Sequence, residues 1–123
     1  MVVAVAVFDF HLPHSRGLKE KRAFVRPLKA RLRGDFQVSA AEVAHHDLLQ
    51  RASVGVAAVG PDREALEPLL ARVLHYVEGF AEEAGVEISA ARREFLAYGD
   101  VGAPGHGFGR GETAEETDGE EES

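Results

Sequence analysis

The 123-residue chain contains no cysteine, so disulfide bonds and thiolate chemistry are excluded. The opening "MVVAVAVFDFHLPH" has no basic residue before its apolar run, and Asp9 and His11 interrupt that run, which does not match a secretion signal. No other stretch approaches the roughly 20 apolar residues that cross a membrane. We therefore expect a cytoplasmic protein. A chain of this length forms one small domain with a core of its own.

The excess of acidic residues is confined to the C-terminal end. The whole chain carries a formal net charge of -7, whereas residues 1–99 hold 13 Lys or Arg and 13 Asp or Glu. Residues 100–123 hold eight acids and one arginine among many glycines, with few apolar side chains such as Phe108. So little apolar surface does not offset the entropy of ordering a chain. We predict a domain at 1–99 and a disordered acidic tail at 100–123.

Apolar spacing alternates between the strand and helix periods along residues 1–99. The stretch "VVAVAVFDFHL" is β-branched and aromatic, and its even positions stay apolar, so these positions are expected to face the core. Further strands are expected in "DFQVSAAEVAHH", "ASVGVAAVG" and "VEISAARREFLAY". One helix is expected at residues 17–34, and a second from Pro61 and Asp62 to Gly85.

The first expected helix contains two residues that oppose helical structure. Pro27 lies well inside it, removes the hydrogen bond to the Ala23 carbonyl, and is expected to bend or break the helix. Gly34 is expected to end it. The second helix is expected to bury Leu66, Leu69, Leu70, Val73, Val77 and Phe80.

The resulting order, β-α-β-β-α-β, is that of the split βαβ or ferredoxin-like fold, in the α+β class. It predicts a four-stranded antiparallel sheet with two helices on one face. The other face stays open unless a partner or the tail covers it.

Several short motifs resemble the bacterial YlxP-like proteins, whose domain has no known function. The resemblance covers residues 2–96, and it rests on "LKEKR" at 18–22, Glu42, Asp47, Gln50, Arg51 and Gly55. The position before the Gln-Arg pair, usually aromatic in that family, is Leu49 here. The resemblance implies a ferredoxin-like fold and, in many bacteria, genes beside those for translation initiation and ribosome maturation. It implies no established activity.

The first helix is a basic element on an otherwise neutral domain. Eight cations fall between residues 16 and 33, and Glu20 is the one acid among them. Cations at a helix N-terminus are unfavourable by themselves, but together with the unpaired N–H groups they suit a phosphate. We therefore predict a site for phosphate or the RNA backbone, formed by Lys19, Lys21, Arg22, Arg26 and Arg51.

An alternative is that these cations are structural. Lys21 or Arg22 would then pair with Glu42 or Asp47 across the fold, and the remaining cations would be solvated. The cations further along are favourable near the helix C-terminus and need no function; these are Lys29, Arg31 and Arg33.

Arg51 has two possible roles at the entrance of the third strand. Its guanidinium fork can extend the phosphate site by holding phosphate oxygens bidentately, or it can form an ion pair with Asp47. Arg92 and Arg93 are adjacent in the last strand and point to opposite faces, so at most one of them can join a basic patch.

The histidines and carboxylates do not form a recognisable metal or catalytic motif. His11 and His14 are three apart at a strand end, and adjacent His45 and His46 point oppositely in an extended chain. The carboxylates are accompanied by no nucleophile motif or Gly-rich phosphate loop. We expect no metal, no small-molecule cofactor and no enzymatic activity.

The open face of the sheet lacks the aromatic platform on which RNA bases stack in RNA-recognition motifs. The first strand offers Val3, Val5 and Val7 there, and the third offers alanine, serine and glycine. An exposed apolar face of this kind is typical of a protein contact.

Two hypotheses follow from the sequence. The first is a non-enzymatic module that associates with RNA or a ribosomal particle and binds backbone phosphates through the basic helix. The alternative is a dimeric protein-interaction or regulatory module that uses the open sheet face, with a homodimer as the simplest form. The acidic tail would compete with RNA for the basic helix, or keep the protein soluble.

Overall fold

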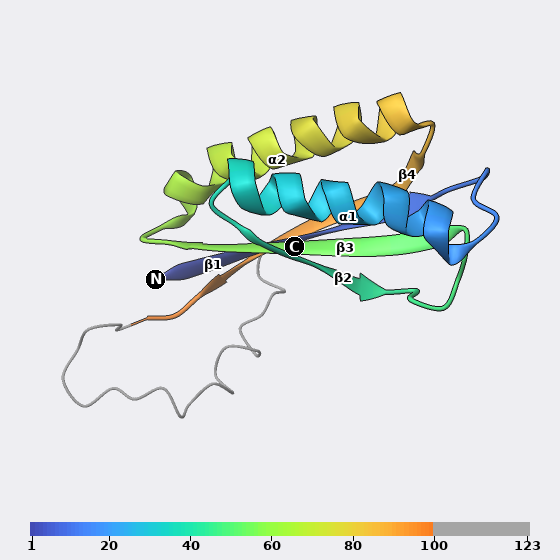
Figure 1. Cartoon of the computed structure of the whole chain (residues 1–123). Coiled ribbons are helices and arrows are strands. Elements are labelled where there is room, and N and C mark those ends of the chain that lie inside the picture. The colour runs from blue at the N-terminus through green and yellow to red at the C-terminus, as the bar shows by residue number, and fades with distance from the viewer. Residues whose placement is uncertain (100–123) are drawn as a thin grey trace.

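The computed structural model describes residues 1–99, and the tail predicted at residues 100–123 lies outside the described residues. Six elements follow in the expected order (Figure 1): β1 (Val2–His11), α1 (Leu18–Asp35), β2 (Ser39–Ala44), β3 (Arg51–Gly60), α2 (Arg63–Ala84) and β4 (Glu87–Ala97). The strands form one sheet in the order β2-β3-β1-β4, with every neighbouring pair antiparallel. The ferredoxin-like α+β fold is confirmed.

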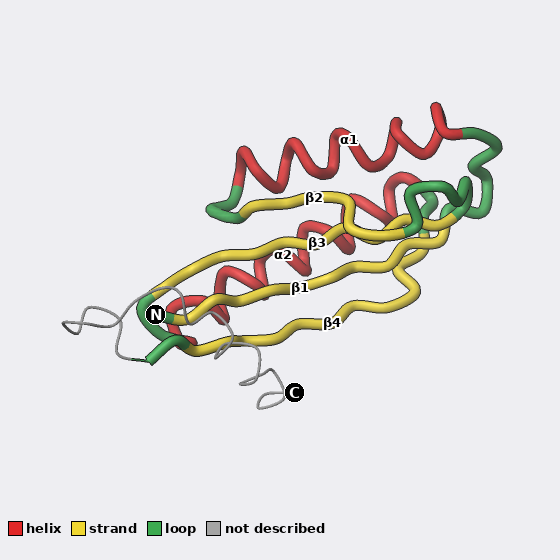
Figure 2. The backbone as a smooth tube through the Cα atoms, turned by 90° about the horizontal axis from the view of Figure 1, so that it is seen from below, coloured by secondary structure: helices red, strands yellow, loops and turns green. Residues whose placement is uncertain are grey.

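Both helices lie on the same side of the sheet (Figure 1). Figure 2, seen from below the sheet of Figure 1, shows the strands in front of α2, with α1 running along the β2 side of the sheet. The sheet has two edge strands, β2 and β4, and one of its faces is covered by neither helix.

The alternation of β1 places its side chains as the sequence predicts. The even positions are all buried under the helices: Ala4, Ala6, Phe8, Phe10 and Leu12. Phe10 meets Phe24 of α1 edge-on, with ring centroids 5.0 Å apart, and Phe24 is 5.5 Å from Phe80 of α2. These aromatic contacts join β1 to both helices in one core.

The helix α1 continues through Pro27, so the expected break does not occur. Pro27 is exposed, and Ala23, whose carbonyl loses its helical donor, is exposed too, so water can satisfy that carbonyl. The helix also passes Gly34 and ends at Asp35, where the N–H of Phe36 donates to the Leu32 carbonyl at 3.2 Å. Gly34 does not adopt a positive φ, which is why it does not end the helix.

The ends of α2 are those expected from the sequence. Asp62 Oδ1 accepts a hydrogen bond from the Ala65 N–H at 2.9 Å, and Gly85 ends the helix in the left-handed region with φ 71°. Leu66, Leu70, Val73 and Val77 are buried, while Leu69 and Phe80 are partly buried against the core. Neither of the two helices in residues 1–99 is long and apolar enough to cross a bilayer.

Candidate nucleic-acid interface

Lys21 lies inside the fold, although it belongs to the predicted phosphate site. Only 3% of the residue is exposed, and its Nζ lies 3.2 Å from Glu42 Oε2. The ammonium also donates to the carbonyls of His45 at 2.6 Å and Leu48 at 2.8 Å, with the His46 carbonyl at 3.4 Å. Glu42 Oε2 is buried without a hydrogen bond, so the Lys21 charge is what compensates it.

Lys21 therefore leaves the set of residues that can hold phosphate. All three donor directions of its ammonium are directed at protein oxygens, and burial prevents an outside anion from reaching it. The structural alternative holds for this residue, with Glu42 as its partner. Its contacts hold the loop between β2 and β3 against the start of α1.

Gln50 secures the other end of the same loop. Its Nε2 donates to the Ser15 carbonyl at 3.2 Å and lies 3.4 Å from the Pro13 carbonyl, and the Leu12 N–H donates to the Gln50 carbonyl at 2.9 Å. Lys21, Glu42 and Gln50, which belong to the motifs of the family resemblance, thus fix the loops at one end of the sheet.

Five cations of α1 form a single row. Lys19, Arg22, Arg26, Lys29 and Arg33 follow each other at spacings of three and four residues, which places them on one side of a helix. We call this row the cation stripe. It extends over about 21 Å, at 1.5 Å per residue.

The cation stripe faces the β2 side of the molecule. Arg33, its last member, donates from Nε and Nη2 to the Ala40 carbonyl of β2, at 3.0 and 2.7 Å. Lys19, Arg22, Arg26 and Lys29 make no ion pair with any residue of the described part of the chain. Because Lys19, Arg22 and Arg26 are also exposed, their charge is open to an outside anion.

Arg31 shows the contrast on the other side of α1. Its Nη1 lies 3.7 Å from Asp35 Oδ2, so its charge is partly compensated by a neighbour one turn away. The sequence interpretation assigned Lys29 and Arg33 to the helix C-terminus together with Arg31. The regular spacing from Lys19 to Arg33 is the signal that separates the first two from Arg31.

Arg51 does not extend the cation stripe. It precedes the buried Ala52 in β3 and pairs in register with His11, so it belongs to the sheet face opposite the helices. Nor does Arg51 pair with Asp47 within residues 1–99. The structure thus divides the predicted site: Lys19, Arg22 and Arg26 lie together, and the other two members lie elsewhere.

The open face has a polar end around Asp9. Ser53, 2% exposed, donates to Asp9 Oδ1 at 2.5 Å, and Arg92 Nη1 lies 3.1 Å from Asp9 Oδ2. The Ser53 hydroxyl and, after it, the Arg92 guanidinium hold the pKa of Asp9 below its ordinary value, against an opposing effect of burial. Arg93 instead lies over the Phe95 ring at 5.4 Å, so the two arginines do point to opposite faces.

The rest of the open face is apolar and hollow beside the edge strand β2. A depression of 340 Å³ is lined by small and β-branched residues, among them Val5, Val7, Ala41, Val43, Gly55 and Ala57. We call it the β2 hollow. A Cβ on Gly55 would lie 3.1 Å from Val43 Cγ1, so the glycine keeps the floor of the hollow low. None of the residues 1–99 that line it is aromatic, as the sequence predicts.

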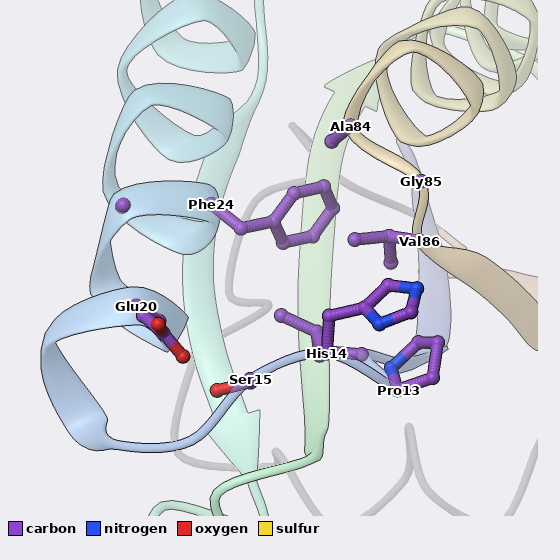
Figure 3. A pocket seen from close by; sticks show the side chains of 10 residues that line it. Pro13, His14, Ser15, Glu20, Phe24, Ala84, Gly85 and Val86 are labelled. Carbon is purple, nitrogen blue, oxygen red and sulfur yellow. The ribbon is translucent and has the colours of Figure 1, made fainter.

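A second pocket, of 350 Å³, lies where the start of α1 meets the end of α2. Figure 3 shows Phe24 and Val86 facing each other across it, with His14 beside them. Two of its polar side chains are engaged with the chain itself: the Ser15 hydroxyl donates to the Gly17 carbonyl at 3.2 Å, and Glu20 accepts from the Arg16 N–H. Among the described residues that line this pocket, no nucleophile is hydrogen-bonded to a base.

Residues 1–99 contain no cluster of side chains that could hold a metal ion. No three histidine or carboxylate side chains of this part of the chain converge on one point. His11 Nδ1 instead lies 3.2 Å from Glu87 Oε1 across the strands, and His46 Nε2 lies 3.2 Å from the Glu42 carbonyl.

Comparison with known families identifies the family of the chain. Residues 3–91 match the family described as "Protein of unknown function (DUF503)", which spans β1 to most of β4. The chain therefore belongs to this family of small domains.

The chain is also similar to one particular bacterial protein. It is 38% identical over 79 residues to "Uncharacterized protein YlxP" of Bacillus subtilis (strain 168), which covers 64% of this chain and 83% of that protein. The resemblance to YlxP-like proteins inferred from "LKEKR" and its companion motifs is thus confirmed. Neither description names an activity.

Proposed function

We propose that this protein is a non-enzymatic cytoplasmic module that associates with RNA, on a ribosomal particle, by binding backbone phosphates along the cation stripe. The observation that carries the proposal is the uncompensated row on α1. None of its five members has an ion pair within residues 1–99, although the domain as a whole is neutral. A helix edge with this charge attracts a polyanion through counterion release.

The row suits a phosphate backbone better than an isolated anion. Its members rise about 4.5 or 6 Å along the helix axis from one to the next, so the charge forms a line rather than a pocket. Arginine binds phosphate oxygens as a fork and lysine binds them as a point charge, and the row contains both.

The proposed binding does not depend on base sequence. Neither the cation stripe nor the β2 hollow contains an aromatic side chain, and stacking on aromatic rings is how single-stranded bases are usually read. A ribosomal particle is favoured as the source of RNA because the resemblance to YlxP-like proteins implies, in many bacteria, genes beside those for translation initiation and ribosome maturation.

The test is the triple variant Arg22→Gln/Arg26→Gln/Lys29→Gln. Its matched control, Arg31→Gln/Arg72→Gln/Arg93→Gln, loses the same charge away from the stripe. We expect the slope of log affinity for RNA against log salt to fall by about two to three for the stripe variant, since each lost phosphate contact removes about 0.7 to 0.9. Equal slopes for the two variants would exclude the stripe as the binding surface.

Sedimentation with ribosomal particles provides the second readout. The wild-type protein should travel with particles at low salt and leave them at high salt, while the stripe variant should remain in the supernatant in both. A stripe variant that still travels with the particles would show that another surface makes the contact.

A dimeric module is the second candidate function, favoured by the apolar part of the open face. Val43 of β2 and Val59 of β3 are 51% and 66% exposed there, on the two strands that follow one another beside the half-buried valines of β1. The variant Val5→Glu would place a carboxylate in any such interface, at a high desolvation cost. If the wild-type chain sediments as a dimer and this variant as a folded monomer, the second candidate is supported.

A further inference from the structure

We propose that residues 100–123 fold back onto the domain, with Phe108 in the β2 hollow and the acidic residues that follow it against the cation stripe. The docked segment would then compete with RNA for α1. The docking itself is argued from the shape and charge of the domain surface. The competition with RNA rests on the proposed function.

The β2 hollow matches the chemistry of Phe108. The surface of the hollow is almost entirely apolar, and its small side chains leave a space of 340 Å³ that no described residue fills. Phe108 is the one aromatic residue after Tyr98, and glycines 107 and 109 on either side allow it to approach a sheet closely. Burial of a phenylalanine is among the larger apolar gains that a single side chain offers.

The chain leaves the domain within reach of the hollow. β4 ends at Ala97, and the Tyr98 N–H donates to the Met1 carbonyl at 2.8 Å, so the exit lies at the start of β1. The hollow around Val5 and Val7 lies about 13 Å along the strands and about 14 Å across them. Phe108 is nine residues beyond Gly99, which extend to about 30 Å.

The acidic residues after Phe108 are complementary in charge to the cation stripe beside the hollow. Seven acids lie between residues 112 and 122, whereas the cation stripe offers five bases. The hollow borders β2, and the stripe faces the same side, because Arg33 reaches the Ala40 carbonyl. Glu112 follows Phe108 by four residues, or about 13 Å of extended chain, and packed layers lie about 10 Å apart. One segment can therefore make both contacts at once.

A second copy of the chain fits the hollow less well. The open face presents valine, alanine, serine and glycine around the hollow, so two such faces would meet without a large side chain to fill either depression. Strand addition at β2 is also obstructed, since the carbonyls of Ala40 and Glu42 are contacted by the side chains of Arg33 and His46.

The absence of cysteine permits a direct test in the full chain. A nitroxide attached through Thr113→Cys should broaden the NMR signals of the Val43 and Val5 methyl groups and of Arg26. Adding Phe108→Ala should restore the valine signals, whereas Val101→Ala, a matched truncation in the same segment, should not. Salt should weaken the effect at Arg26 more than at the valines, because exposed charges are screened and apolar contacts are not.

Each other outcome contradicts the proposal. Broadening that appears only when spin-labelled chains are mixed with separate isotope-labelled chains would identify a second copy as the occupant. Unbroadened valine signals in the full chain would show that the hollow stays empty of Phe108.

RNA affinity separates this proposal from the proposed function. If about 90% of molecules hold the docked form, Phe108→Ala should tighten RNA binding about tenfold, while Val101→Ala leaves it unchanged. Broadening without RNA binding in any variant would retain the docking and refute the proposed function. RNA binding along the cation stripe without broadening would support the proposed function and refute the docking.

Discussion

Lys21 and its neighbour Arg22 differ by one position in α1 and lie in opposite surroundings. Lys21 is 3% exposed and bound to Glu42 and two loop carbonyls, whereas Arg22 is exposed and has no ion pair within residues 1–99. One step along a helix turns a side chain by about 100°. That rotation, rather than the shared charge, decides which cation stabilises the fold and which is available to a partner.

The two kinds of cation also differ in what their loss leaves behind. Removing Lys21 would leave the Glu42 carboxylate, 18% exposed, without its compensating charge. Removing the exposed Arg22 side chain would leave only solvent in its place and no uncompensated charge. The comparison therefore predicts large stability effects on the inner side of α1 and small ones on the outer side.

The largest effect is expected from Lys21→Met. Breaking a buried ion pair by removing one partner typically costs about 3–5 kcal/mol. The midpoint of urea unfolding should therefore fall sharply, with the loop between β2 and β3 gaining the most in hydrogen exchange.

The double variant Lys21→Met/Glu42→Leu serves as its control. With both charges gone, no uncompensated carboxylate remains, so the double variant should be more stable than Lys21→Met alone. A double variant as unstable as the single one would show that the carbonyl contacts of Lys21, rather than its charge on Glu42, hold the loop.

The next largest effect on stability is expected at Asp9, whose carboxylate on the open face of the sheet is bound by the Ser53 hydroxyl. The pKa of Asp9 is lowered mainly by the Ser53 hydroxyl, so this interaction stabilises the fold above the unfolded pKa and is lost as the pH falls through the folded one. Ser53→Ala should cost about 1–3 kcal/mol at pH 7, since a poorly solvated carboxylate loses a donor.

The pH profile distinguishes this cause from a simple packing defect. The difference in unfolding free energy between wild type and Ser53→Ala should narrow below about pH 4, where Asp9 protonates in the unfolded chain. A difference that stays constant from pH 7 to pH 3 would mean that the hydroxyl acts independently of the Asp9 charge.

Arg33 combines features of both kinds of cation, because it belongs to the cation stripe and also donates hydrogen bonds to β2. Arg33→Gln removes two hydrogen bonds to the Ala40 carbonyl, and a net loss of about 0.5–1.5 kcal/mol is expected. Arg31→Gln, which loses only an exposed pair with Asp35, should change stability by less, as measured by urea unfolding of both variants.

Local patterns of the sequence were sufficient to predict most of the fold. The alternation of β1 identified its buried side, and Asp62 and Gly85 marked the ends of α2, because each signal depends on residues close in sequence. The predicted break at Pro27 and the predicted helix end at Gly34 were wrong, because Ala23 is open to solvent and Gly34 does not adopt a positive φ, and spacing reveals neither.

The candidate site was less predictable because it depends on contacts distant in sequence. Glu42 was identified as a possible partner of Lys21, but the loop carbonyls that complete the Lys21 environment lie 24 to 27 residues away and carry no side-chain signal. Arg51 was misplaced because its strand face followed from the register with β1, which only the folded sheet defines.

The smallest predicted effect tests the outer cations alone. Lys19 lies in the first turn of α1, where Gly17 provides no side-chain cap and Glu20 is the one acid. Lys19→Gln should therefore stabilise the protein by about 0.3–1 kcal/mol, because it removes a cation from the positive end of the helix dipole. Arg26→Gln is the matched control, since its position in the middle of the helix lies outside the range of that effect. Urea unfolding at low salt should show a gain for Lys19→Gln that shrinks as salt is added, with Arg26→Gln unchanged. A loss of stability on removing Lys19 would place it with Lys21 among the cations that hold the fold.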